Sequence, residues 1–331
     1  MIPMRNVVVA DRAKYVGDNK MGFFDKIIQV HNLYKRGHLD SLESFLENAR
    51  ERAGTVNARL SELERDVYGS KRNLGQIQAA QVRKSLALPT NINFANQHVS
   101  FETAYRVVAA GCAPFLVGPA GSGKSTILSQ IADAMELPFY PMSVNSLTSD
   151  YNIIGYNDAN GKYVPTIFRQ AYEHGGVFSF EEIDAGNPNV LTVINNAMSQ
   201  DKYAFPDKIV DKHPQFIMTA SGNTYGTGAN IKYIGRNPLD AATLDRFVMV
   251  HTDYDTGLED RLCTNKDWLN WVHRVRGVVN DLDMKMVVGT RAVLHGDKLL
   301  NAGLPRAAVE QMVVFRGLPM ADIEKIRGRI R

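Results

Sequence analysis

The sequence predicts an α/β fold. A parallel sheet flanked by helices is expected over residues 90–255, with a helical region over 256–331 and an α-helical extension over 1–89. Two observations predict this arrangement. From about residue 90, short apolar runs of β type alternate with helical stretches, which is the pattern of a parallel sheet. Before that, apolar residues recur at alternating steps of three and four, which is typical of a coiled-coil helix.

The heptad segment covers residues 39–67. Its seam positions are apolar, and charged residues lie between them, as a narrow contact stripe requires. The centre of the seam is small, with Ala49 and Ala53, which favours a tight contact between two helices. This helix either packs as a hairpin within its own chain or contacts another chain. Residues 90–98, which follow Pro89, are interpreted as a linker.

Composition excludes several classes of protein. The 331 residues are 44% hydrophobic and 22% charged, and the two cysteines, Cys112 and Cys263, form neither a disulfide framework nor a zinc motif. No apolar run reaches the ~20 residues of a membrane span. Because the N-terminus also lacks the features of a secretion signal, we expect a cytoplasmic protein without a membrane partner. The net charge of +3 is weaker than a nucleic-acid footprint usually requires.

Four apolar runs are expected to form strands: 114–117, 137–144, 177–180 and 216–220. Helices are expected over 101–110 and 126–135. Polar residues follow the first, third and fourth runs. Because the carboxyl ends of parallel strands meet at one edge of a sheet, we expect these polar residues to form one site.

A glycine-rich motif, GPAGSGKS, follows the first predicted strand and precedes a helix. It matches the GxxxxGK[ST] pattern of a phosphate-binding P-loop in the context that the pattern requires. Backbone N–H groups and the helix N-terminus would bind phosphates, Lys124 would reach the β and γ phosphates, and Ser125 would ligate Mg²⁺. The predicted nucleotide-binding residues are Gly118, Pro119, Ala120, Gly121, Ser122, Gly123, Lys124, Ser125 and Thr126.

Two acidic residues, Glu181 and Glu182, follow the third predicted strand. This resembles a Walker B segment, in which the first acid holds the Mg²⁺ shell and the second polarises the attacking water. The first acid is usually Asp, and the longer Glu181 can still reach the metal directly or through water. We therefore predict Ser125 and Glu181 as metal ligands and Glu182 as general base. Asn223, after the fourth strand, is placed to orient the water.

The motifs GPAGSGKS, FEEID, ASGN, LDRF and GTR occur in this order along residues 90–331. This order is similar to that of the AAA+ ATPases, in particular the branch of MoxR, CbbQ/NorQ, cobaltochelatase CobS and the dynein-related proteins. The resemblance implies ATP and Mg²⁺ as cofactors and a homo-oligomeric, hexameric ring. It places Asn223 as sensor 1 and Arg246 as the arginine finger on the neighbour's nucleotide. It also places Arg291 as sensor 2 in a small helical lid over residues 256–331. Arg236 is a second candidate for reaching across the interface.

Two segments are candidates for a central pore. Residues 201–214 look like the hairpin that this branch inserts near its second helix. Residues 153–163 contain an Asn-Gly turn between aromatic residues, so Tyr156 and Tyr163 either contact the pore or pack in an ordinary hairpin.

The resemblance implies a chaperone-like ATPase that remodels or activates a protein partner, for example one with a von Willebrand A domain. Two alternatives stay open. If Lys202, Lys208 and Lys212 line a basic pore, the protein would be a motor on nucleic acid with salt-dependent binding. If Glu181 slows hydrolysis, the protein would be an ATP-gated assembly module.

Overall fold

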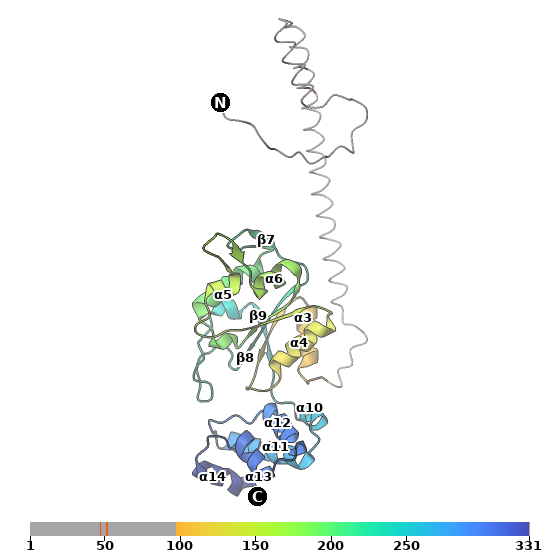
Figure 1. Ribbon diagram of the computed structural model, residues 1–331, viewed down its shortest axis with the longest axis vertical. Helices are drawn as coiled ribbons and strands as arrows, with labels where there is room; N and C mark the ends of the chain where they lie inside the picture. Colours follow the sequence, from red (N-terminus) through yellow and green to blue (C-terminus); the bar gives the residue numbers. More distant parts are fainter. Residues whose placement is uncertain (1–46, 48–50, 52–96, 331) are drawn as a thin grey trace, which may run out of the picture. The chain divides into compact units, whose positions relative to one another are not determined.

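In the computed structural model, the described residues are 47, 51 and 97–330 (Figure 1). The chain divides into two compact units, residues 1–74 and 75–331. The predicted heptad helix lies outside the described residues, apart from Glu47 and Glu51, which are helical and exposed.

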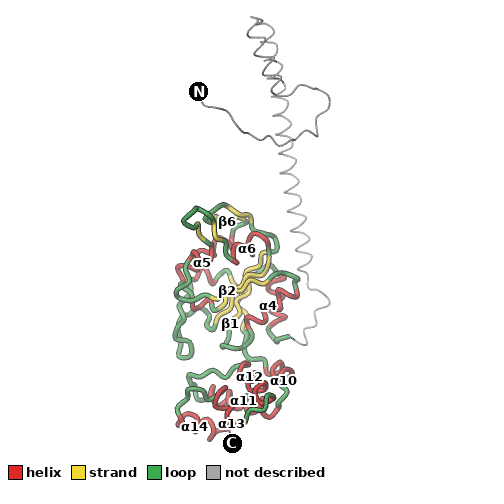
Figure 2. Tube along the Cα trace, viewed as in Figure 1, coloured by secondary structure: helices red, strands yellow, loops and turns green. Residues whose placement is uncertain are grey.

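A five-stranded parallel sheet forms the centre of this part, with strand order β2-β5-β8-β1-β9 (Figure 2). Its strands are β1 (Ala113–Val117), β2 (Phe139–Ser143), β5 (Gly176–Glu181), β8 (Phe216–Gly222) and β9 (Phe247–His251). The four strands that the sequence predicted are present, and β9 is an additional edge strand. Because β5, β8 and β1 are neighbours, the polar segments that follow them meet at one edge.

Helices cover both faces of the sheet. Leu116 of β1 packs in one apolar core with α3 (Phe101–Ala109) and α4 (Lys124–Ala134). Phe115 and Val117, which alternate with it, pack in the opposite core. That second core is closed by four helices: α5 (Asp150–Ile154), α6 (Ile167–His174), α7 (Pro188–Leu191) and α8 (Val193–Ser199). This two-faced packing confirms the predicted α/β fold.

The ends of α6 illustrate how local chemistry sets the helix bounds. Thr166 caps its N-terminus, where the Thr166 side chain accepts a hydrogen bond from the backbone N–H of Arg169. Gly175 follows its last residue with φ +87°, a conformation that ends a helix at low steric cost.

The C-terminal region is helical, as predicted. It consists of α10 (Thr256–Leu262), α11 (Lys266–Asp281), α12 (Thr290–Asn301), α13 (Arg306–Val309), a π-helical turn (Glu310–Val314) and α14 (Met320–Ile330). Its apolar core includes the fully buried Trp268 of α11, which packs against Gly296 of α12 so closely that a Cβ at Gly296 would lie 2.0 Å from the indole ring. None of the described helices combines the length and the apolar run that crossing a membrane requires.

The smaller elements form two antiparallel hairpins and two short helical segments. They are β3 (Tyr156–Asn157) with β4 (Tyr163–Val164), β6 (Lys202–Ala204) with β7 (Ile209–Asp211), a 3-10 turn (Ile183–Ala185) and α9 (Ala241–Leu244). In the first hairpin the two tyrosines differ. The hydroxyl of Tyr163 donates to the carbonyl of Ile154 over 2.8 Å, and the Arg169 guanidinium lies 5.2 Å from its ring centroid. Tyr156 is exposed. Tyr163 thus packs against residues of α5 and α6. A pore contact of Tyr156 stays a prediction.

The lysines of the second hairpin are paired with carboxylates. Lys202 lies 2.7 Å from Asp211, Lys208 lies 3.1 Å from Glu173, and Lys212 lies 3.7 Å from Asp201. These pairs lower the net charge of the surface that a basic pore would need. The structure therefore gives no specific support to the nucleic-acid alternative.

Candidate nucleotide-binding site

The P-loop, residues 118–125, turns from the end of β1 into the start of α4. Gly121 and Gly123 have φ values of +79° and +94°, which residues with side chains rarely adopt. A Cβ on Gly118 would lie 1.8 Å from the carbonyl oxygen of Thr252. The backbone path itself therefore requires these glycines, and it leaves the N-terminus of α4 facing the site.

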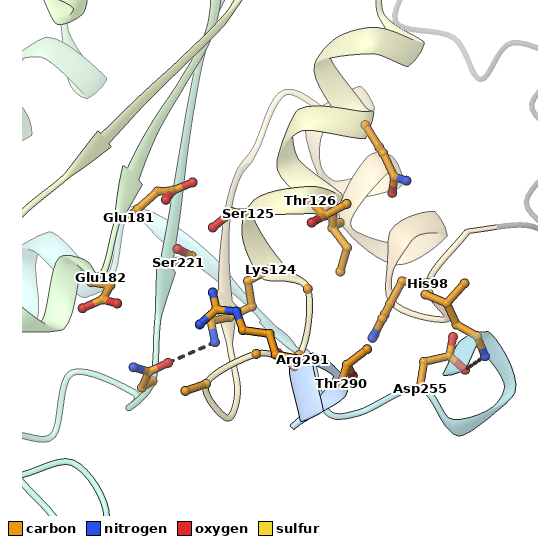
Figure 3. A pocket seen from close by; sticks show the side chains of 18 of the residues that line it. His98, Lys124, Ser125, Thr126, Glu181, Glu182, Ser221, Asp255, Thr290 and Arg291 are labelled. Atoms are coloured by element: carbon orange, nitrogen blue, oxygen red, sulfur yellow. Dashed lines mark hydrogen bonds between the residues drawn. The ribbon is translucent and has the colours of Figure 1, made fainter. Parts of the chain in front are cut away.

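A cavity of about 380 Å³ opens at this loop, within the range of about 300–1,000 Å³ that small-molecule sites occupy. Figure 3 shows His98 and Asp255 at one end of the cavity and Glu181 and Glu182 at the other. The predicted site residues in its wall are Ala120, Gly121, Ser122, Gly123, Lys124, Ser125, Thr126, Glu181, Glu182, Asn223 and Arg291. Residues that lie more than 150 positions apart in the sequence thus meet in one cavity.

Lys124 is the central cation of the site. Its ammonium donates to the carbonyls of Gly118 and Pro119 over 2.8 and 2.9 Å, and to Oδ1 of Asn223 over 3.0 Å (Figure 3). Gly118 and Pro119 do not line the cavity, but their carbonyls hold this side chain. Burial lowers the pKa of Lys124 to about 8, although two nearby carboxylates act against it. A polyanion in the cavity would stabilise the charged form of this lysine.

Ser125 and Glu181 line the same cavity as Lys124. Their hydroxyl and carboxylate oxygens are the hard donors that Mg²⁺ prefers, and Mg²⁺ is usually held by one or two protein carboxylates together with phosphate oxygens. Among residues 97–330 there is no group of three or more His, Cys, Asp or Glu side chains arranged to hold a metal ion. The donor set therefore fits Mg²⁺ that is bound together with a nucleotide.

Asp184 organises the strand ends behind the cavity, a role that the sequence did not reveal. It is fully buried, and its Oδ2 accepts hydrogen bonds from the backbone N–H groups of Asn223 and Thr224 over 3.0 and 2.8 Å. The Thr224 hydroxyl donates to the same oxygen over 2.9 Å. Asp184 therefore fixes the segment that presents the Asn223 side chain to Lys124.

His98 closes the other end of the cavity and was also missed, because its segment reads as a linker. It is buried, its Nδ1 accepts from the backbone N–H of Ser100 over 3.0 Å, and its Nε2 lies 3.0 Å from the carbonyl of Asp253. This network assigns the ring proton to Nε2. The cavity wall also includes three leucines of the lid: Leu258, Leu262 and Leu294. Apolar side chains of this kind in the wall suit a nucleobase.

The lid presents Arg291 to the P-loop. A Cβ on Gly121 would lie 3.6 Å from Cγ of Arg291, so the two segments are in close proximity. Thr290, the first residue of α12, donates from its hydroxyl to the buried carboxylate of Glu259 over 2.6 Å. Arg276 donates to both oxygens of Glu259 over 2.9 and 2.7 Å. A buried ion pair thus fixes the start of the helix that carries Arg291.

A second contact connects this ion pair to the P-loop. The Arg276 guanidinium lies 4.2 Å from the ring centroid of Tyr254, and the Tyr254 hydroxyl donates to the carbonyl of Ala120 over 3.0 Å. The backbone N–H of Ala120 donates to the Tyr233 hydroxyl over 2.9 Å. Two tyrosines therefore hold one P-loop residue from both sides.

Comparisons with known proteins agree with this geometry. Residues 114–247 match the family model of the AAA domain, dynein-related subfamily. This match runs from β1 to the start of β9 and includes the P-loop and the acidic segment after β5. The fold is that of an AAA+ P-loop NTPase. A search of curated protein sequences finds no match.

Similar solved structures include a RuvB variant from Thermotoga maritima, which is 17% identical and covers 61% of this chain and 67% of its own, with a TM-score of 0.37. NtrX from Brucella abortus in complex with ADP is 16% identical over 77% of this chain and 57% of its own, with a TM-score of 0.40. A second RuvB variant from Thermotoga maritima is 16% identical over 68% of this chain and 71% of its own, with a TM-score of 0.39.

Arg246, the predicted arginine finger, is not part of the cavity wall in this AAA+ fold. Its Nε lies 3.3 Å from the carbonyl of Asn195 and 3.2 Å from Oγ of Ser199, and its Nη1 contacts the carbonyl of Ala242. The side chain is therefore held away from the nucleotide site of its own chain, where a residue acting on a neighbour would lie. Its role in trans stays a prediction.

Arg236, the second candidate for reaching across the interface, contacts two carboxylates of its own chain. Its guanidinium donates to Glu182 over 3.1 Å and to Asp184 over 3.2 Å within the same chain, and the side chain is 11% exposed. Sequence order could not reveal this placement, because the loop between β8 and α9 folds back onto the end of β5.

Proposed function

We propose that this chain is an ATP hydrolase that works as a ring of AAA+ subunits and uses hydrolysis to remodel or activate a protein partner. One observation carries the proposal. A lysine, two carboxylates, an amide and an arginine, all in the order of the AAA+ motifs, converge on one cavity of about 380 Å³. These are the parts that phosphoryl transfer requires, because its catalysis consists mainly of positioning and charge stabilisation.

The binding step follows from the P-loop and the lid. The N-terminus of α4 and Lys124 neutralise the phosphates, and the end of the cavity with His98 accepts the base. Ser125 and Glu181 would hold Mg²⁺, which neutralises charge on the phosphate oxygens when it is bound. Arg291 approaches from the lid as sensor 2 and stabilises negative charge on the same phosphates.

The hydrolytic step uses Glu182 and Asn223. Glu182 accepts the proton of the water that attacks the γ phosphorus, and the bond between that phosphorus and the leaving oxygen of ADP breaks. Asn223, placed by Asp184 and hydrogen-bonded to Lys124, orients the water. Arg246 of a neighbouring subunit supplies the remaining positive charge. Such an arginine contributes ~10³–10⁵-fold in rate in related phosphoryl-transfer enzymes.

Because Arg246 would act in trans, assembly and catalysis are one event in this proposal. A homo-hexameric ring of the MoxR/CbbQ type satisfies this requirement. The exposed Tyr156 hairpin and the N-terminal residues 1–89 are the candidate contacts to a protein partner, for example a von Willebrand A domain protein. The paired hairpin lysines make nucleic acid a weaker candidate.

The test is the ATPase rate measured against protein concentration, with mass photometry on the same samples with and without ATP. We expect the rate per subunit to rise as rings appear. Rings that form with ATP but do not turn over would favour an ATP-gated assembly module, and no rise in rate with ring formation would contradict catalysis in trans.

A pair of variants tests the base. Glu182→Gln should bind ATP and retain it unhydrolysed, because the amide cannot accept the proton. Glu102→Gln is the matched control, since Glu102 forms an exposed pair with Arg106 on α3 and is not part of the cavity. It should keep wild-type turnover. Rapid hydrolysis by Glu182→Gln would place the base elsewhere.

A further inference from the structure

The loop between β8 and α9 is fastened to the acidic segment that follows β5. The backbone N–H of Asn237 donates to the carbonyl of Asp184 over 2.7 Å, and the Asn237 side-chain amide donates to the carbonyl of Gly186 over 2.9 Å. Tyr233 of the same loop bonds the P-loop at Ala120. These contacts fix the backbone around Arg236 on both sides, so the position of its guanidinium is set by the fold.

Arg236 bridges two carboxylates, one buried and one exposed. Asp184 is fully buried and also accepts hydrogen bonds from Asn223 and Thr224, so it is a fixed anchor. Glu182 has a side chain that is 60% exposed. Nη1 of Arg236 donates to Asp184 and Nη2 donates to Glu182. Because Asp184 is fixed, the guanidinium that is bonded to it also restrains the position of the Glu182 carboxylate.

Glu182 depends on this contact for its orientation. Among residues 97–330, Arg236 is the hydrogen-bond partner of its carboxylate, and the bond uses Oε2 only. Oε1 is left to accept a proton. The backbone of Glu182 is left-handed, with φ 55° and ψ 40°, which costs energy of the order of 1 kcal/mol or more in a residue other than glycine. Such strain persists where the surrounding structure holds a side chain in a required place.

We propose that Arg236 is a positioning residue for the active site of its own subunit, where it orients the carboxylate of Glu182 toward the attacking water. This inference rests on the proposed function, in which Glu182 is the base. It assigns the two arginines of this region to opposite sides of the subunit: Arg236 acts in cis through Glu182, and Arg246 acts in trans on a neighbour's nucleotide.

The first test separates binding from turnover. In Arg236→Ala we expect kcat to fall by ~10²-fold, which is the loss that a displacement of a reacting group by about 1 Å causes. The Kd for a non-hydrolysable ATP analogue should stay within about twofold of wild type, because the P-loop and the lid bind the phosphates. Arg236→Lys keeps the charge but not the fork that reaches two carboxylates, so it should recover part of the turnover.

The second test separates cis from trans by mixing inactive variants. A mixture of Arg246→Ala with Glu182→Gln should recover turnover, because some interfaces then combine an intact base with an intact finger. A mixture of Arg236→Ala with Glu182→Gln should stay as slow as Arg236→Ala alone. Mass photometry confirms that both mixtures form rings, and Arg236→Lys replaces Arg236→Ala if the alanine variant does not assemble.

Three results would overturn the inference: recovery in the Arg236 mixture to the level of the Arg246 mixture, turnover of Arg236→Ala equal to or above wild type, or a loss confined to analogue binding. These differ from failure of the proposed function, which would appear as absence of ATP hydrolysis in wild-type rings. If the Arg246 reference mixture does not recover, the arginine finger is wrong and the kcat of Arg236→Ala decides the role of Arg236.

Discussion

Replacement of Glu259 by Gln should destabilise the protein far more than an ordinary surface substitution. The Glu259 carboxylate is fully buried in the lid and accepts hydrogen bonds from Arg276 at two nitrogens and from Thr290. Nε2 of His273 lies 2.7 Å from it as well. A neutral amide keeps one acceptor oxygen but turns its NH₂ group toward donors, so the Arg276 guanidinium loses its counter-charge in a buried place.

The magnitude follows from this burial. The Arg276 side chain is 9% exposed, so water cannot replace the lost carboxylate. Breaking a buried pair by removing one partner costs about 3–5 kcal/mol. The contact of Arg276 with the Tyr254 ring is retained and offsets part of this cost. We therefore expect a loss near the lower limit, about 3 kcal/mol in the free energy of unfolding at pH 7.

The effect of pH has a definite sign. Burial alone would raise the pKa of Glu259, but the hydrogen bonds from Arg276 and Thr290 and the charge of Arg276 outweigh it and hold this pKa below its ordinary value. A carboxylate with a lowered pKa stabilises the fold above the unfolded pKa of about 4.3 and loses this contribution as the pH falls through the folded value. The difference between wild type and Glu259→Gln should therefore be largest at neutral pH and shrink below about pH 4.3.

Urea unfolding of both proteins at several pH values measures this difference. Asp260→Asn is the matched control, because the neighbouring Asp260 forms an exposed pair with Lys266 over 2.9 Å. Exposed pairs contribute about 0–1 kcal/mol. If Glu259→Gln is no less stable than Asp260→Asn, or if its deficit does not decrease in acid, the ion pair does not stabilise the lid.

Two further substitutions test packing and catalysis. Gly296→Ala would place a Cβ 2.0 Å from the Trp268 ring and should lower the free energy of unfolding by about 1–3 kcal/mol, measured by urea unfolding. Gly277→Ala, on α11 with nothing within 4 Å, should be neutral or stabilising, and equal effects of the two would refute the close contact. Arg246→Ala should lose turnover by ~10³-fold or more while it keeps analogue binding, and unchanged turnover would remove Arg246 from the site.

The sheet and the central parts of the site could be predicted because their physical causes are local. An apolar strand followed by a glycine-rich turn and a helix specifies a phosphate-binding loop within about 25 residues of sequence. Parallel strands then bring their polar ends together whatever the loops between them do. For this reason Lys124, Glu181, Glu182 and Asn223 were predicted to meet, and the structure places them in one cavity.

Other parts could not be predicted, because their causes lie in tertiary contacts. His98 lies in a polar segment without periodicity, and it becomes part of the site because the backbone carbonyl of Asp253, just after β9, accepts its hydrogen bond. Tyr163 has the same aromatic character as Tyr156, and the difference between them is the Arg169 guanidinium that packs against Tyr163. In both cases the deciding partner lies on another element.

The two arginines after β8 show most clearly what sequence order leaves open. Arg236 and Arg246 are ten positions apart. The short polar segments beside them do not indicate in which direction either side chain extends. What separates them is the buried carboxylate of Asp184. Among residues 97–330, Arg236 is the cation that forms an ion pair with it. A buried carboxylate is costly unless a positive charge or several donors accompany it, so the fold itself requires a cation at this place. Arg236 meets that requirement through contacts within its own chain. Arg246 is held by two carbonyls and a hydroxyl, which are uncharged partners that it could leave at little electrostatic cost in the proposed ring.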